Sequence, residues 1–281
     1  MEPVAGCGLH SDKGNVALID ITRQEWLCLD LPTTGYEAAW DLQSRLVAAR
    51  RDGVLDADVI LLLEHHPVFT VGRRGGVDNL TVSEAFLEKQ GIAVIQVERG
   101  GNITFHGPGQ LVMYPIIDLR CPGLRVVEYV DKLEEVMIRT ARDWGIPAGR
   151  NSLNRGVWVG NSKLGSVGIA IRRGISFHGA ALNVNVSLKP FEWINPCGLQ
   201  DVTVTSLQQQ LSSSVSVRHV RERLKHHFSR VFNIELVESR SISDNAHEEA
   251  VAGCELRVQR IFSSLRHTER ILWLKVMSRP C

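Results

Sequence analysis

Regularly spaced apolar residues predict the main helices of this chain. Between residues 127 and 144 the apolar positions recur every three or four residues: Val127, Val130, Leu133, Met137, Ala141 and Trp144. That period places them on one face of an amphipathic helix. Similar patterns predict helices over residues 36–50, 83–90 and 217–231, the last with a basic opposite face.

Apolar runs and alternating patterns predict strands between these helices. Residues 59–63 are apolar at every position, which is typical of a strand buried on both faces. Further strands are predicted over residues 92–97, 111–117 and 180–186, and segments 156–160 and 166–171 predict a hairpin around residues 161–165. The resulting fold class is α+β, with mixed β-sheets and flanking helices.

Composition and charge restrict the class of protein. The 281 residues are 44% hydrophobic and 22% charged, which are values of a globular protein. Lys and Arg number 32 against 31 Asp and Glu, and this balance argues against a partner such as duplex nucleic acid. The apolar runs are all shorter than the roughly 18 residues that would predict a membrane span. The first 30 residues carry more acidic than basic side chains, unlike a targeting segment, so a cytoplasmic protein is expected.

The patterned region suggests one main domain. Residues 1–24 are weakly patterned and are interpreted as a leader, residues 25–238 as the catalytic domain, and residues 239–281 as a C-terminal extension of unknown role that begins with a polar linker. The six cysteines include no CxxC pair, so neither a thiolate zinc site nor another metal site is expected.

Cys197 is a candidate nucleophile. It lies between Pro196 and Gly198 in a predicted turn, where a thiol is exposed and can react if a nearby positive charge stabilises its thiolate. Lys163, in a predicted loop rich in Gly, Ser and Asn, could supply that charge, lower the pKa of the thiol and shuttle protons. The alternatives are an inert buried cysteine and an ordinary solvated lysine.

Two segments rich in small residues are candidate ligand sites. Residues 99–110 contain four glycines and a proline, which predicts an irregular loop that lets a ligand approach the main chain. Arg99 and His106 flank it and could bind an acyl carbonyl or a phosphate, although a surface turn would explain the same pattern. Residues 177–183 form a second predicted loop that contains His178. The glycine pattern matches neither the dinucleotide nor the Walker motif.

These segments resemble the lipoyl(octanoyl) transferases of lipoate biosynthesis. The similarity is carried by residues 99–110, 163–168, 177–184 and 195–199, and it extends over roughly residues 28–235 in the family's order. The resemblance implies the α+β catalytic domain shared with biotin protein ligases and lipoate–protein ligases.

The resemblance also implies an acyltransferase reaction. The enzyme would accept an octanoyl group from octanoyl–acyl carrier protein, hold it as a thioester on Cys197, and pass it to a lysine of a lipoyl domain. The acceptors would be E2 subunits of 2-oxo-acid dehydrogenases and the glycine-cleavage H protein. No cofactor is implied, because the thioester is already activated. Lys163 would tune the nucleophile. The implied substrate-binding residues are Arg99, Gly100, Gly101, Asn102, Ile103, Thr104, Phe105, His106, Ser166, Val167, Gly168, Gly179, Ala180 and Ala181.

Two other functions fit the same segments. An ATP-dependent lipoate or biotin protein ligase would use the same fold without needing the cysteine. A non-catalytic protein could bind acyl carrier protein or a lipoyl domain through the tail or the basic helix, because acyl carrier protein is acidic.

Overall fold

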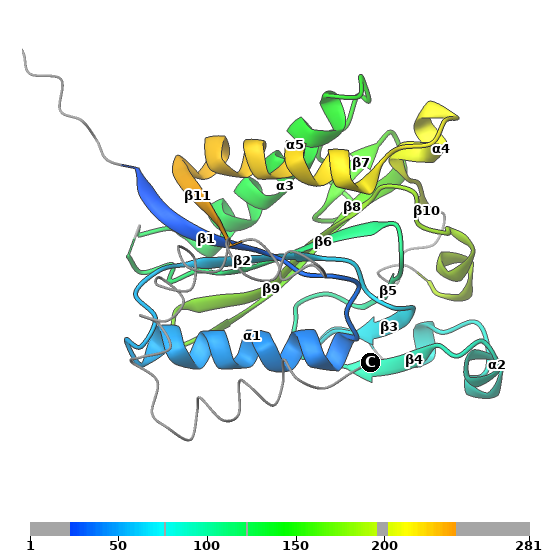
Figure 1. The fold of residues 1–281 in the computed structure, drawn as a ribbon. Coiled ribbons are helices and arrows are strands. Elements are labelled where there is room, and N and C mark those ends of the chain that lie inside the picture. The colour runs from blue at the N-terminus through cyan, green and yellow to red at the C-terminus, as the bar shows by residue number, and fades with distance from the viewer. Residues whose placement is uncertain (1–22, 76, 122, 196–201, 240–281) are drawn as a thin grey trace, which may run out of the picture.

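The computed structural model describes residues 23–75, 77–121, 123–195 and 202–239, which fold into two β-sheets with flanking helices (Figure 1). The large sheet has the strand order β10-β8-β9-β6-β2-β1-β11, with β7 paired to β8. Its strands are β1 (Gln24–Asp30), β2 (Val59–Leu63), β6 (Gln110–Ile116), β7 (Val157–Val159), β8 (Ser162–Arg172), β9 (Ile175–Asn183), β10 (Thr203–Val204) and β11 (Ile234–Ser239). The small sheet has the order β4 (Ala93–Gln96), β3 (Val68–Val71) and β5 (Ile103–His106).

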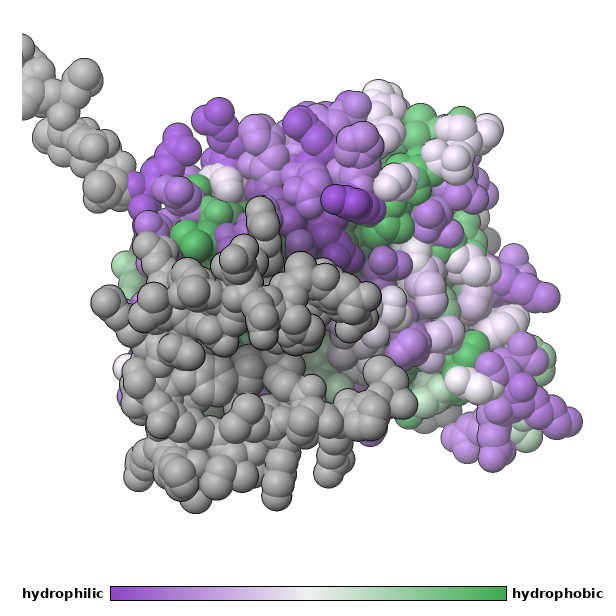
Figure 2. Space-filling view, viewed as in Figure 1, coloured by the Kyte–Doolittle hydropathy of each residue, from purple (hydrophilic) through white to green (hydrophobic). Residues whose placement is uncertain are grey.

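Helices cover both faces of the large sheet (Figure 1). The α-helices are α1 (Tyr36–Arg51), α2 (Glu84–Lys89), α3 (Val126–Arg142), α4 (Leu207–Leu211) and α5 (Val217–Phe232), and the 3-10 helices are η1 (Val77–Asn79) and η2 (Lys189–Trp193). Helices α3 and α5 pack on one face, and α1 packs on the other. The outward side of α5 carries many of the hydrophilic side chains at the top of Figure 2.

Strand β6 shows how the sheet separates two apolar cores. Leu111 and Met113 pack in the core below α3, whereas Val112 and Tyr114 pack in the core that α1 covers. Successive side chains of a strand point to opposite faces, so one strand contributes to both cores. This explains why the segment is apolar throughout rather than alternating.

The predicted α+β class, with mixed sheets and flanking helices, is confirmed. The predicted helices over residues 36–50, 83–90, 127–144 and 217–231 correspond to α1, α2, α3 and α5. The predicted strand over residues 59–63 is β2, buried at every position. The strands predicted over residues 92–97 and 111–117 match β4 and β6 to within two residues.

Three loop predictions were wrong in part. Residues 103–106, inside the predicted irregular loop, form strand β5, because the glycines stand on either side of this segment and leave it free to pair with β3. The hairpin turn comprises only Gly160 and Asn161, so Lys163 belongs to a strand rather than a loop. Residues 177–183 belong to β9, which begins five residues before the predicted strand start and ends at Asn183.

The structure also contains strands that the pattern missed. Strand β1 pairs in parallel with β11, the last described element of the chain. The predicted leader over residues 1–24 lies almost entirely outside the described residues, although Gln24 already begins β1. The predicted C-terminal extension over residues 239–281 also lies outside them, apart from Ser239. Within the described part of the chain, each helix is too short or too polar to cross a membrane.

The core position of α3 predicts a large difference between two substitutions on this helix. Leu133 is fully buried, whereas Val127 is 65% exposed. Leu133→Ala should lower the free energy of unfolding by about 2–5 kcal/mol, because it leaves a cavity in the core. Val127→Ala should change it by less than about 0.5 kcal/mol. Urea unfolding followed by circular dichroism would measure both, and equal losses would contradict this assignment of the buried face.

Candidate active site

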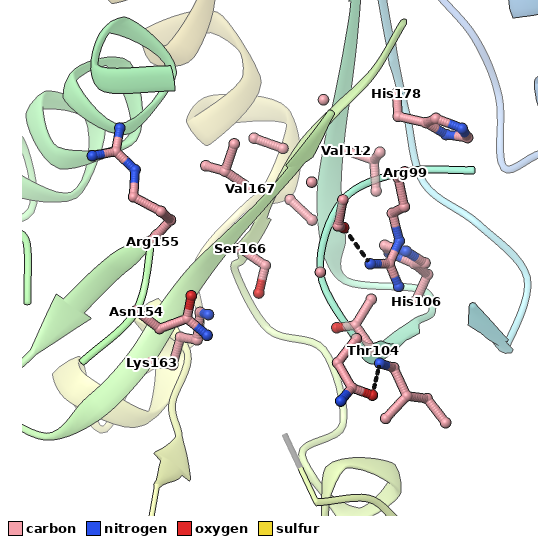
Figure 3. Close-up of a pocket in the computed structure, with 18 of the residues that line it drawn as sticks. Arg99, Thr104, His106, Val112, Asn154, Arg155, Lys163, Ser166, Val167 and His178 are labelled. Atoms are coloured by element: carbon pink, nitrogen blue, oxygen red, sulfur yellow. Dashed lines mark hydrogen bonds between the residues drawn. The ribbon is translucent and has the colours of Figure 1, made fainter. Parts of the chain in front are cut away.

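A cavity of about 330 Å³ lies between strands β8 and β9 and the segment that leads into β5 (Figure 3). All but one of the residues expected to bind substrate line it: Arg99, Gly100, Gly101, Asn102, Ile103, Thr104, His106, Ser166, Val167, Gly168, Gly179, Ala180 and Ala181. Lys163 lines it as well. Phe105 is not among the lining residues, and its ring packs against Phe69 and Phe191 with centroids 5.3 and 5.6 Å apart.

Small residues on neighbouring strands make room for this cavity. Ser166 pairs with Ala181, and Gly168 pairs with Gly179. Residues two apart along a strand share a face, so these four form a contiguous patch of small side chains. Further along β9 the same face carries Phe177, which packs in the core under α1. The change from Gly179 to the large Phe177 side chain therefore limits how far the cavity extends along β9.

Arg99 is part of the cavity wall and not of a surface turn. Its side chain is buried, and its guanidinium donates to the Thr70 hydroxyl oxygen at 2.8 Å and to the Thr70 carbonyl oxygen at 2.6 Å. The next residue, Gly100, donates its N–H to the Ile169 carbonyl oxygen at 2.9 Å. These bonds attach the segment before β5 to the small sheet on one side and to β8 on the other.

His106 and His178 lie on the side of the cavity opposite Lys163 (Figure 3). Tyr36 and Tyr114 also line the cavity, and their rings contact those of His106 and His178. Gln110 donates to Asn183 at 2.9 Å, so its amide oxygen faces His106 and accepts from the Nδ1–H group at 2.7 Å. Nε2 of His106 then faces the Thr70 hydroxyl at 3.3 Å. Burial holds the pKa of His106 well below its usual value. His106 is therefore a neutral residue with a fixed tautomer.

His178 has an unusual backbone conformation for a strand residue. Its φ angle is +55°, and its N–H group donates to Oε1 of Gln43 at 2.7 Å. Its Nδ1 lies 3.4 Å from the Tyr36 hydroxyl, and its Nε2 lies 3.7 Å from Oε2 of Glu98. Burial lowers the pKa of His178 to about 4, although the nearby Glu98 carboxylate opposes this. The left-handed backbone rotates this side chain out of the regular alternation of β9.

Lys163 is held in the wall at the other end of the cavity. Its side chain is 6% exposed, and its Nζ lies 5.2 Å from the centre of the Trp158 ring, a cation–π distance. Burial of this lysine excludes the ordinary solvated position that its sequence also allowed.

The candidate nucleophile Cys197 lies outside the described residues, as does its predicted turn. The residues described on either side of that segment locate its ends. Ile194 and Val204 both line the cavity, and Val204 is paired with Lys163 in the β10–β8 ladder.

Several lining residues were missed by the sequence analysis. Tyr36 and Tyr114 stand in the predicted helix over residues 36–50 and the predicted strand over residues 111–117, and Asn154 and Arg155 belong to a loop without a motif. No local signal distinguishes these residues, because the fold brings them to the cavity from separate elements. Within the described ranges, no group of three or more His, Cys, Asp or Glu side chains is placed to hold a metal ion.

The buried neutral histidines predict a stability that decreases with acidity. Burial lowers the pKa of His65 from 6.5 to about 4, and that of His178 similarly. The unfolded chain therefore binds more protons than the folded chain between these pH values, and the free energy of unfolding falls as the pH decreases through this range. Each histidine contributes at most about 1.4 kcal/mol per pH unit.

His65→Gln should reduce this slope, because glutamine does not titrate. Urea unfolding at several pH values between 4.5 and 7 would measure the slopes of both proteins. An identical slope in the variant would show that folding does not lower the pKa of His65.

Comparisons with known proteins identify the family. The family model described as "Lipoyl protein ligase A/B catalytic domain" matches residues 35–229. The chain is 52% identical over 198 residues to an octanoyltransferase of Desulfotalea psychrophila, covering 70% of this chain and 89% of the relative. It is 46% identical to an octanoyltransferase of Syntrophobacter fumaroxidans, covering 73% of this chain and 89% of the relative.

Solved structures share the fold. A bipartite lipoate protein ligase of Thermoplasma acidophilum aligns with a TM-score of 0.59 at 20% identity, covering 79% of this chain and 88% of the ligase chain. A lipoate–protein ligase A bound with ATP aligns with a TM-score of 0.59 at 18% identity, covering 80% of this chain and 90% of that one. The sequence matches and the shared fold together show that this chain belongs to the lipoyl protein ligase A/B catalytic domain family.

Proposed function

We propose that this chain is an octanoyltransferase of protein lipoylation. It takes the octanoyl group of octanoyl–acyl carrier protein onto Cys197 and transfers it to a lysine of a lipoyl domain. The proposed acceptors are E2 subunits of 2-oxo-acid dehydrogenases and the glycine-cleavage H protein, and the proposed compartment is the cytoplasm. The octanoyltransferases at 52% and 46% identity, each covered over 89% of its length, support the activity.

One observation carries the proposed mechanism. Lys163, the patch of small residues on β8 and β9, and both ends of the segment that contains Cys197 belong to the same cavity. Acyl transfer through a thioester requires a cationic side chain, a cysteine and a place for the acyl chain. The space over the small residues Ser166, Gly168, Gly179 and Ala181, called the slot below, is that place. The Lys163 ammonium would stabilise the Cys197 thiolate, because an adjacent positive charge favours the ionised thiol.

In the first step, the Cys197 thiolate attacks the thioester carbonyl carbon of the donor. A new carbon–sulfur bond forms, the bond to the carrier sulfur breaks, and the carrier thiolate leaves and takes up a proton. Lys163 is the proposed proton donor, which leaves it as a neutral amine. Because one thioester replaces another, the step needs no external source of energy such as ATP.

In the second step, the amine of the acceptor lysine attacks the carbonyl carbon of the acyl-cysteine. The carbon–nitrogen bond forms, the Cys197 thiolate leaves, and the nitrogen gives up a proton to the neutral Lys163. The products are the octanoyl amide and the enzyme in its starting protonation state. A single cysteine suits this two-step relay, since a thiolate is both a good nucleophile and a good leaving group.

The slot provides a place for the acyl chain. Val112 and Ala181 supply apolar side-chain surface beside Gly168 and Gly179. The histidines at the far side are neutral, since burial lowers the pKa of His106 and His178. Neutral imidazoles, together with an Arg99 guanidinium that is bonded to the Thr70 hydroxyl and carbonyl oxygens, avoid the free-energy cost of placing a hydrocarbon chain against an unpaired charge.

We predict a covalent octanoyl adduct on Cys197. The purified protein mixed with octanoyl–acyl carrier protein should gain the mass of one octanoyl group, which peptide mass spectrometry should locate at Cys197. Hydroxylamine should remove it, as expected of a thioester. Cys197→Ala should lose both adduct and transfer to an apo lipoyl domain.

The same assay separates the alternative functions. Transfer of free octanoate that requires ATP and survives in Cys197→Ala would identify a ligase. Binding of the donor or acceptor without transfer would identify a non-catalytic protein. Either result would overturn the proposed function.

We also predict that removal of the Lys163 ammonium makes Cys197 less reactive near neutral pH. In Lys163→Ala, the rate of Cys197 alkylation by iodoacetamide should reach half its maximum at a higher pH than in the unmodified protein, because the thiolate loses its neighbouring positive charge. Lys132→Ala serves as a control, since Lys132 contacts the Val231 carbonyl oxygen and the Phe232 ring on α5. Equal pH profiles for all three proteins would rule out the proposed pairing.

A further inference from the structure

We propose that Glu134 of helix α3 is a positioning residue for Lys163. It acts through Gly156 and Trp158, which form the surroundings of the lysine side chain. This inference rests on the proposed function, because it assumes that Lys163 takes part in the reaction.

Glu134 is a buried carboxylate with donors on both oxygens. Its side chain is 1% exposed. Oε1 accepts from the Gly156 N–H group at 2.7 Å and lies 3.2 Å from Nε of Arg155. Oε2 accepts from Nε of Arg150 at 3.1 Å. A buried charge is stabilised only when such partners surround it, so this carboxylate attaches the segment 150–156 firmly to α3.

Gly156 transmits this attachment to the lysine. Its φ angle is +128°, which side-chain-bearing residues rarely adopt. A Cβ atom at this position would lie 2.8 Å from Cε of Lys163 and 2.5 Å from the Gly165 carbonyl oxygen. The bare main chain of Gly156 is therefore in contact distance of the end of the lysine side chain. The Glu134 hydrogen bond fixes the peptide group that makes this contact.

Trp158 forms a second side of the lysine's surroundings. Its ring centre lies 5.2 Å from Nζ of Lys163. Its indole N–H donates to the Asn154 carbonyl oxygen at 3.1 Å, so the ring orientation depends on the same segment that Glu134 holds. Asn154 and Lys163 both line the cavity, and Figure 3 shows them on the same side of it. The segment thus couples the α3 carboxylate to the direction of the ammonium group.

The position of an ammonium group matters for catalysis because a small displacement is costly. A misplacement of about 1 Å can reduce the rate about 100-fold. Gly168 and Ala181 lie on β8 and β9, whereas Glu134 bonds to Arg150, Arg155 and Gly156 in segment 150–156. Loss of Glu134 should therefore lower kcat and leave the KM for the octanoyl donor unchanged.

The test compares Glu134→Ala, Glu134→Gln and Glu135→Gln in the steady-state transfer of octanoyl from octanoyl–acyl carrier protein to an apo lipoyl domain. We expect Glu134→Ala to lower kcat about 100-fold with the donor KM within about twofold. Glu134→Gln keeps an oxygen that accepts from Gly156 and should recover most of kcat. Glu135→Gln is the matched control. Glu135 lies on the same helix as Glu134 and pairs with Arg139 and Arg150, but it makes no bond to Gly156. It should retain full activity.

Trp158→Phe keeps the test decisive if Glu134→Ala does not fold. It retains a ring but loses the N–H bond to Asn154, and it should lower kcat about 10-fold at unchanged donor KM. The inference is wrong if kcat is unchanged in Glu134→Ala or, where that variant is unfolded, in Trp158→Phe. It is also wrong if only KM changes, or if Glu134→Gln is as impaired as Glu134→Ala. Lys163→Ala in the same assay distinguishes a failure of the proposed role of Lys163 from a failure of the positioning role of Glu134. Full activity in that variant overturns the role of Lys163 itself, whereas its loss beside a fully active Glu134→Ala overturns only the positioning role.

Discussion

Gly179 lies so close to strand β6 that a methyl group on its Cα would fall 2.1 Å from the Met113 carbonyl oxygen. The same closeness recurs at Gly168, where a Cβ atom would lie 3.1 Å from both the Gly100 carbonyl oxygen and Cδ of Arg99. These contacts bring the main chains of β6, β8, β9 and the segment before β5 together around the cavity. The walls of the site are consequently formed largely by paired main chain, which is rigid, and by side chains too small to fill the space between them.

Burial changes the chemistry of the histidines near this cavity. Burial keeps the pKa of His106 well below its usual value and lowers that of His65 to about 4, so both are neutral at pH 7. Each has defined partners, Gln110 and Thr70 for His106, and Tyr114 and the Thr34 carbonyl for His65. Polar groups that satisfy one another in this way can border an apolar ligand without leaving unpaired donors beside it. The region is polar in composition yet suited to a hydrocarbon chain.

The sequence predicted the helices and central strands because their apolar spacing has one explanation. The apolar spacing places Leu133, Met137 and Ala141 on the buried face of α3. Val127, from the same pattern, is 65% exposed because it lies in the first turn of the helix. The secondary-structure prediction was wrong where a high density of glycine was interpreted as a loop. Residues 103–106 form a strand because β3 supplies an antiparallel partner, and Lys163 is in a strand because two residues suffice for the hairpin turn. Both strands depend on pairing with a neighbouring strand, which the composition of the segment itself does not reveal. Glu134 and Trp158 were placed on a helix and a strand without any functional signal, because their relation to Lys163 exists only after folding.

The proposed reaction requires precise geometry of the reacting groups, and it needs no added source of free energy. Exchange between two thioesters is nearly isoenergetic, and the final amide is more stable than either, so the protein has to supply alignment and protonation states rather than energy. Three contacts hold Lys163 in place: the β8 backbone pairing, the Trp158 ring and the Gly156 main chain. The pairing of Val204 with Lys163 brings the end of the cysteine-bearing segment back to the same strand. In the proposed mechanism donor and acceptor react at the same sulfur in turn. A single Lys163 ammonium on the strand that pairs with Val204 would then serve both steps, giving a proton in the first and receiving one in the second.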